Sequence, residues 1–162
     1  MSAEFRVEAP RLWLVLARCH HALSQIAEHS VEEAGLCLTD FAALEALLHK
    51  GPLTITEIQG KVMLAGGSMT AAVDRLDQKG LVVRKPAPGD RRAKLLHLTP
   101  EGRRVVETVF RRHAAELAAA MAVLSPNEKR ELYALLKKLG LFAAEAGAGN
   151  GAKRRFEDDT GS

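Results

Sequence analysis

The chain has 162 residues, of which 47% are hydrophobic and 4% aromatic, and its formal net charge is +3 with a pI near 9.0. This length supports one globular domain with a core, and it leaves little room for a second. The sequence contains no common hydrolase motif and no zinc-protease motif, its six histidines are scattered, and its two cysteines have no metal-ligand spacing. We therefore expect no enzyme, no cofactor and no metal site.

The composition also favours a mainly helical protein, because alanine and leucine are abundant and aromatic residues are few. No apolar stretch approaches the ~20 residues that span a bilayer. The N-terminus shows no secretory pattern, so we expect a cytoplasmic protein.

Residues 1–9 are predicted to be flexible, and Pro10 then opens a long helix that reaches about residue 28. The apolar residues of this helix repeat every three or four positions, but Trp13 and Leu14 fall outside the main stripe. A helix that is apolar on more than one side needs two packing partners. A second subunit can be one of them.

Cys19 lies in this helix between Arg18 and His20, which are neighbours of the kind found around reactive thiols. A redox-sensing role for Cys19 is therefore an alternative hypothesis. We favour a buried structural thiol.

Thr39 is predicted to cap a helix that runs to Lys50 and stops at Gly51-Pro52. Thr54 and Glu57 then form the two ends of a capping box, so a short helix should begin at Ile55 and end near Leu64. These two helices come just before the most informative part of the chain.

A turn at Gly66-Gly67 is predicted to lead into a second helix, from about Gly67 to Lys79, with Gly80 as its left-handed stop. Met69, Val73 and Leu76 form the buried stripe of this helix. The opposite face consists of short hydroxyls, a small alanine and a few polar side chains, namely Ser68, Thr70, Ala71, Asp74, Arg75 and Gln78. Such a face suits hydrogen bonding to base edges and phosphates in a DNA groove.

A hairpin follows, with strands predicted at 81–85 and 93–98 and a stiff turn at 86–92. Arg91 and Arg92 stand at the tip, and Asp90 is placed to orient Arg92 by a salt bridge. Positive charge is concentrated here, because the segment 79–92 carries five basic residues against one acidic residue. An arginine on a projecting loop can enter the narrow minor groove of A·T-rich DNA.

Thr99 and Pro100 are predicted to open another helix that reaches about Val123. The sequence Ser125-Pro126-Asn127-Glu128 is a second capping box, so a last helix should run from 126 to about 146. Residues 147–162 are poor in apolar side chains and are predicted to be disordered.

The segment from Leu53 to Gly102 resembles the winged helix-turn-helix of the MarR family of transcriptional regulators. Five pieces carry the resemblance in order: Gly67-Ser68-Met69-Thr70, Val73-Asp74-Arg75-Leu76, Lys79-Gly80-Leu81-Val82, Asp90-Arg91-Arg92 and Leu98-Thr99-Pro100-Glu101-Gly102. The resemblance implies a mainly α fold over residues 10–146. In that fold a winged helix-turn-helix spans about 39–100, and helices at about 10–28 and 126–146 form a dimer.

The resemblance further implies a homodimeric repressor that binds a pseudo-palindromic operator in double-stranded DNA until a small-molecule effector releases it. The expected DNA-binding residues are Ser68, Thr70, Ala71, Asp74, Arg75, Gln78, Lys85, Asp90, Arg91, Arg92 and Lys94, with Arg92 aligned to the family's minor-groove arginine. An effector pocket is expected near Trp13, Arg18 and Phe41. The competing hypothesis from another class is a helical protein-interaction module whose basic hairpin binds an acidic partner.

Overall fold

The computed structural model describes residues 8–62, 68–88 and 90–146, and it describes the backbone but not the side chains of 90–92. Within these ranges the fold consists of six helices and one antiparallel hairpin. In chain order the elements are α1 (Ala9–Glu32), α2 (Leu38–Lys50), α3 (Ile55–Lys61), α4 (Met69–Gln78), β1 (Val82–Ala87), β2 (Asp90–Leu98), α5 (Pro100–Ala120) and α6 (Pro126–Ala146). The mainly α fold with a β-hairpin is confirmed.

Helix α1 begins with Pro10 in its first turn, as predicted, but it ends at Glu32 and so runs four residues beyond the expected end near residue 28. The additional turn carries Ser30 and Val31, the two buried residues of the helix, and α1 packs against α5 and α2. An ion pair between Arg112 of α5 and Glu33 fixes the end of α1. The predicted flexible segment 1–9 lies largely outside the described residues, and Ala9 already belongs to α1.

The predicted cap of α2 is wrong. The helix begins at Leu38, and Cys37 rather than Thr39 takes the N-cap position, without a side-chain cap bond. Leu38 is partly buried against the core, and this packing favours the earlier start. At the other end, Gly51 has a φ of 78° and terminates α2 as predicted.

Helices α3 and α4 form the predicted helix-turn-helix, but α3 ends at Lys61 and not near Leu64, because the backbone of Val62 is already extended. The capping box is present in α3, because the Thr54 amide donates to Glu57 Oε2 at 2.7 Å and the Glu57 amide donates to Thr54 Oγ1 at 3.2 Å. Ser68 caps α4 by accepting from the Ala71 amide, and Gly80 follows the helix with a φ of 68°. The predicted turn at Gly66-Gly67 lies outside the described residues.

The core sits where α2, α3, α4, β2 and α5 meet. Each of these elements contributes an almost fully buried side chain, in turn Leu44, Ile58, Leu76, Leu96 and Val106. The helix-turn-helix and the hairpin therefore share one apolar core with the middle of the chain, which holds them as one unit.

The hairpin is longer than predicted. Strands β1 and β2 pair from Val82↔Leu98 to Pro86↔Lys94, and after a shift in register Ala87 pairs with Asp90. Pro86 and Ala87 thus belong to β1, and β2 begins at Asp90 instead of Ala93. At its base the hairpin is joined to the segment before α3, because the Leu96 amide donates to the Leu53 carbonyl at 2.8 Å and the Leu53 amide donates back at 3.3 Å.

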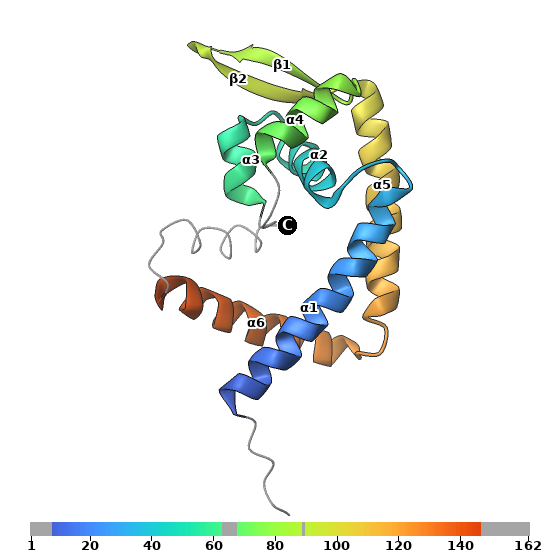
Figure 1. Cartoon of the computed structure of the whole chain (residues 1–162), viewed down its shortest axis with the longest axis vertical. Coiled ribbons are helices and arrows are strands. Elements are labelled where there is room, and N and C mark those ends of the chain that lie inside the picture. Colours follow the sequence, from blue (N-terminus) through green and yellow to red (C-terminus); the bar gives the residue numbers. More distant parts are fainter. Residues whose placement is uncertain (1–7, 63–67, 89, 147–162) are drawn as a thin grey trace, which may run out of the picture.

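Helices α5 and α6 begin where predicted, but α5 ends at Ala120, three residues before the expected end near Val123. Thr99 caps α5 by accepting from the Gly102 amide, and Ser125 and Glu128 form the second capping box. Figure 1 shows the hairpin at one end of the molecule, with α6 and the first half of α1 at the other. No residue of α6 is buried, although the helix carries several large apolar side chains. The predicted disordered tail 147–162 lies outside the described residues.

Among the described helices, none combines the length and the apolar character needed to cross a membrane.

Candidate nucleic-acid interface

Helix α4 presents the two faces that its sequence predicts. Met69, Val73 and Leu76 are buried together with Ala72. The predicted contact residues of this helix are all exposed, namely Ser68, Thr70, Ala71, Asp74, Arg75 and Gln78. A polar face with short side chains is therefore available at the surface, on a helix whose other side is fixed in the core.

Two of these predicted contact residues form ion pairs with other elements of the protein. Arg75 reaches back to α2, where its Nη2 donates to Asp40 Oδ1 at 2.6 Å and its Nε lies 3.2 Å from the same oxygen. The Arg75 side chain is 45% exposed, whereas that of Asp40 is 3% exposed. The hydrogen bond to Asp40 raises the pKa of Arg75, so this guanidinium is charged at every relevant pH. Arg75 Nη2 also lies 3.4 Å from Cys37 Sγ.

Asp74, the second of these residues, pairs with Arg84 of β1. Arg84 Nε lies 3.5 Å from Asp77 Oδ2, so the guanidinium stands between two carboxylates that both come from α4. These ion pairs join α4 to the hairpin. Arg75 and Asp74, which are adjacent in sequence, thus tie α4 to α2 on one side and to β1 on the other.

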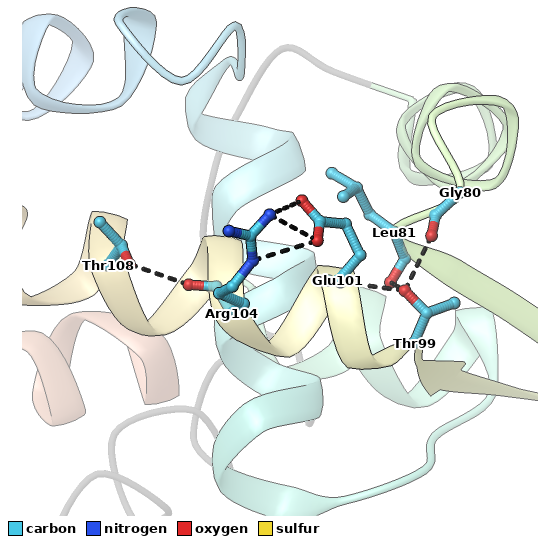
Figure 2. A network of polar contacts seen from close by, with 7 residues as sticks. Gly80, Leu81, Thr99, Glu101, Arg104 and Thr108 are labelled. Atoms are coloured by element: carbon cyan, nitrogen blue, oxygen red, sulfur yellow. Dashed lines mark hydrogen bonds and ion pairs between the residues drawn. The ribbon is translucent and has the colours of Figure 1, made fainter.

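A third connection holds the base of the hairpin against α5 (Figure 2). The Thr99 hydroxyl donates to the Gly80 carbonyl at 2.7 Å, and its oxygen accepts from the Gly102 amide at 2.9 Å. The Thr99 amide donates to the Leu81 carbonyl at 3.1 Å. The end of α4, the start of β1 and the first turn of α5 are therefore linked through one threonine.

The first turns of α5 are further ordered by local contacts. Figure 2 shows the Arg104 guanidinium on the Glu101 carboxylate, with Nη2 2.7 Å from both oxygens, and the Thr108 hydroxyl on the Arg104 carbonyl. These bonds lie one and two turns beyond Thr99. They extend α5 as a regular helix from the base of the hairpin.

The hairpin itself carries the predicted basic residues. Lys85 on β1 and Lys94 on β2 are exposed. Asp90, Arg91 and Arg92 form the first residues of β2, and the predicted Asp90–Arg92 salt bridge lies outside the described side chains. Contact of these residues with DNA stays a prediction, as it does for the exposed face of α4.

The predicted effector residues occupy different environments in the single subunit. Phe41 is buried and its ring lies 4.9 Å from that of His113 on α5. His113 Nδ1 is in turn 2.7 Å from the Ser30 hydroxyl, which donates to the Ala27 carbonyl, so Nδ1 is the donor to Ser30. Trp13 is 71% exposed and Arg18 is also exposed, both on α1. Phe41 and His113 thus mark a junction of α1, α2 and α5.

The predicted burial of Cys19 is wrong for the single subunit, because Cys19 is exposed on α1. The apolar pattern of α1 faces away from its own subunit over much of its length, so a residue on that pattern is not covered by the rest of the chain. Among the described residues, no group of three or more histidine, cysteine or acidic side chains could hold a metal ion.

Asp40 and Arg84 are the residues of this region whose roles the sequence analysis missed. The sequence does contain a hint for Asp40, since this carboxylate stands directly before the apolar residues Phe41 to Leu44, and a buried carboxylate requires a cation nearby. The sequence gives no sign of the role of Arg84, because a charged residue in a hairpin is ordinarily solvated.

Comparison with known proteins gives consistent results. The MarR family model matches residues 36–94. The HTH-type transcriptional regulator MhqR of Bacillus subtilis is 37% identical over 135 residues, which cover 83% of this chain and 93% of that relative. A crystal structure of a probable transcriptional regulator from Pseudomonas aeruginosa aligns with a TM-score of 0.70 and 27% identity, over 80% of this chain and 96% of that one.

A further solved structure shares the fold at lower identity. The organohalide-sensing RdhR transcriptional regulator, in its 2,4-dichlorophenol-bound form, aligns with a TM-score of 0.77 over 93% of this chain and 91% of that chain, at 19% identity. At this identity the likeness concerns the fold.

Proposed function

The chain belongs to the MarR family of transcriptional regulators, and from this we propose that it binds a pseudo-palindromic operator as a homodimer and represses transcription until a small molecule releases it. The observation that carries the proposal is the exposed polar face of α4, fixed by ion pairs to α2 and β1 and flanked by a basic hairpin. Its B. subtilis relative MhqR is likewise a regulator, which is a non-enzymatic role. Since a regulator acts where the chromosome lies, we also place the protein in the cytoplasm.

The geometry suits the major groove. Helix α4 has ten residues and is therefore about 15 Å long. In helix-turn-helix proteins the second helix enters the major groove with its N-terminal residues nearest the bases. Here those residues are Ser68, Thr70 and Ala71, which are small enough for close approach, and Ala71 can meet a thymine methyl group. The tip of the hairpin would then reach the adjacent minor groove, with Arg92 as the inserted side chain.

The dimer is proposed from uncovered apolar surface. Exposed large apolar side chains gather on the first half of α1 and along α6, at Leu12, Trp13, Leu14, Val15, Leu132, Tyr133, Leu135, Leu136, Leu139 and Phe142. A small monomer rarely leaves so much apolar surface in contact with water. A two-fold axis through these helices would place two copies of α4 on one face, to be matched to half-sites about 34 Å apart.

The ligand is proposed to be a small aromatic or acidic molecule that binds between the dimer helices and the winged unit, near Trp13, Arg18 and Phe41. Within one subunit Trp13 lies about 25 Å along α1 from the turn that meets Phe41 and His113, so such a site would have to combine these residues from both subunits. The dichlorophenol bound by the structural neighbour supports an aromatic ligand for this fold. An aromatic ring can stack on Trp13, and Arg18 can pair with a phenolate or carboxylate. Redox sensing by Cys19 is the alternative form of control.

A random-sequence selection with the purified full-length protein tests the proposal. We expect the enriched duplexes to share a pseudo-palindrome whose half-sites lie one helical turn apart. Enrichment of no sequence, together with salt-dependent binding to any polyanion, would instead favour a module that binds acidic proteins.

A further inference from the structure

The exposed face of α4 was expected to offer Arg75 to DNA, yet the structure joins Arg75 to Asp40 over 35 positions of sequence. Two guanidinium nitrogens face the carboxylate, and Nη2 donates to Oδ1 at 2.6 Å. Asp40 is 2% exposed, so Arg75 is the cation that compensates its buried charge. An arginine engaged in this way has little freedom to reorient towards a base.

Further contacts surround the Asp40–Arg75 ion pair and hold α4 in place. Asp40 is the third residue of α2, three positions after the N-cap residue Cys37, and Cys37 Sγ contacts the same guanidinium. One turn beyond Arg75, at the C-cap of α4, Lys79 Nζ donates to the Gly35 carbonyl in the loop that precedes α2. Arg75 and Lys79 therefore fasten one side of α4 to residues 35–40, while Asp74 is fastened to β1. With both sides held, the rotation of α4 about its own axis is fixed.

We propose that Asp40 and Arg75 are positioning residues for DNA recognition, with Arg75 acting through Asp40 to set how α4 presents Ser68, Thr70, Ala71 and Gln78 to the operator. The inference rests on the proposed DNA binding and goes beyond it, because it assigns specificity to an interaction within the protein. Arg75 then need not touch a base.

Asp40 is adjacent in sequence to Phe41, which contacts His113 of α5. One turn of α2 thus holds both the recognition helix and the helix that leads towards the proposed dimer. This explains why a buried carboxylate is placed at the start of α2, where an apolar residue would be easier to bury.

Direct reading and positioning predict different behaviour of Asp40→Asn and Arg75→Gln. If Arg75 contacts a phosphate, Arg75→Gln lowers the salt dependence of the affinity by about one unit, and if it contacts a base, this variant loses the base preference at one operator position. In either case Asp40→Asn frees the arginine and does not weaken binding. If Arg75 positions α4, both variants weaken binding to the selected operator about tenfold, with an unchanged salt slope. The double variant is then no weaker than the weaker single variant, because both changes remove one interaction.

The measurement uses the full-length protein and the duplex that the wild type selects, across a salt series. Arg111→Gln, which removes the same charge from an exposed site on α5, is the control and should bind like the wild type. Thermal unfolding establishes that each variant is folded. Arg75→Lys keeps the argument testable if Asp40→Asn does not fold, because lysine retains the charge but cannot form the forked contact.

Under the proposal Arg75→Lys also binds about tenfold more weakly. Wild-type affinity in Arg75→Lys or Asp40→Asn, or additive losses in the double variant, would overturn it. A wild-type protein that selects no duplex would instead refute the proposed function itself.

Discussion

Gly102 in the first turn of α5 lies against the Leu81 carbonyl so closely that a Cβ built on Gly102 would stand 1.9 Å from that oxygen. The contact joins α5 to the start of the hairpin and accompanies the Thr99 bonds to Gly80 and Leu81. Any side chain at position 102 must therefore push the hairpin away from α5.

Gly102→Ala is predicted to destabilise the fold by about 1–3 kcal/mol, the usual cost of inserting a methyl group where there is no room. The measurement is the free energy of unfolding in urea. Gly60→Ala is the matched control, because a Cβ at Gly60 in α3 meets nothing within 4 Å. It is expected to stabilise the protein by about 0.4–1 kcal/mol through the lower entropy of the unfolded chain. Equal effects of the two substitutions would contradict the close contact at Gly102.

Deletion of residues 126–146 is predicted to abolish the dimer, because α6 contributes much of the uncovered apolar surface. A single change should also weaken it. Leu136→Glu places a charge among Leu132, Leu135 and Leu139. We expect the dissociation constant of the dimer to rise at least about tenfold. Ala134→Glu is the control, since at 100° per residue it points to the other side of the helix. Sedimentation of the two variants at micromolar concentration tests the interface, and a stable dimer without α6 would show that it lies elsewhere.

The capping box of α3 predicts a pH dependence of stability. Hydrogen bonds from the Thr54 amide and hydroxyl lower the pKa of Glu57 below its ordinary value of 4.5. The folded state therefore binds the proton less readily than the unfolded state. The stabilisation by ionised Glu57 is complete when the pH is well above 4.5, the pKa of the unfolded state. It is lost as the pH falls through the lower pKa of Glu57 in the folded state.

Urea unfolding of the wild type and Glu57→Gln, at one protein concentration between about pH 7 and about pH 3, measures this contribution. The wild type should be the more stable at neutral pH, and the difference should vanish in acid. A difference that does not change with pH would show that the carboxylate charge plays no part in the cap.

The hairpin arginine predicted from the sequence has its own test. Arg92→Ala should weaken binding to A·T-flanked sites by roughly 1–3 kcal/mol and lower the salt slope by about one unit, as expected for the loss of one groove or phosphate contact. Asp90→Ala should weaken binding less, although it removes a negative charge. Tighter binding in Asp90→Ala, or unchanged binding in Arg92→Ala, would mean that the hairpin is not seated in the minor groove.

The features predicted correctly from the sequence are those set by local chemistry. Thr54 with Glu57 and Ser125 with Glu128 start their helices because the partners are three residues apart and need nothing else. Gly80 ends its helix because a left-handed backbone suits glycine. The buried and exposed faces of α4 follow from the same local periodicity.

The features that were mispredicted or missed depend on partners distant in sequence. Helix α1 continues to Glu32 because Ser30 is buried and bonded to His113, 83 positions away. Thr39 has the right side chain for a cap, but packing of Leu38 against the core favours an earlier start of α2. The exposed face of α4 was predictable, but the engagement of Arg75 by Asp40 was not, because no local pattern reveals which distant carboxylate meets an exposed arginine.

The most direct test of the central claim, that this chain is a sequence-specific DNA-binding regulator, is its equilibrium affinity for the selected duplex and for a shuffled duplex of the same composition. The comparison should run from about 50 to about 200 mM salt. We predict that binding to both duplexes weakens steeply with salt and that the selected duplex stays at least about a thousandfold tighter at physiological salt. Equal affinity for the two duplexes throughout would contradict the account.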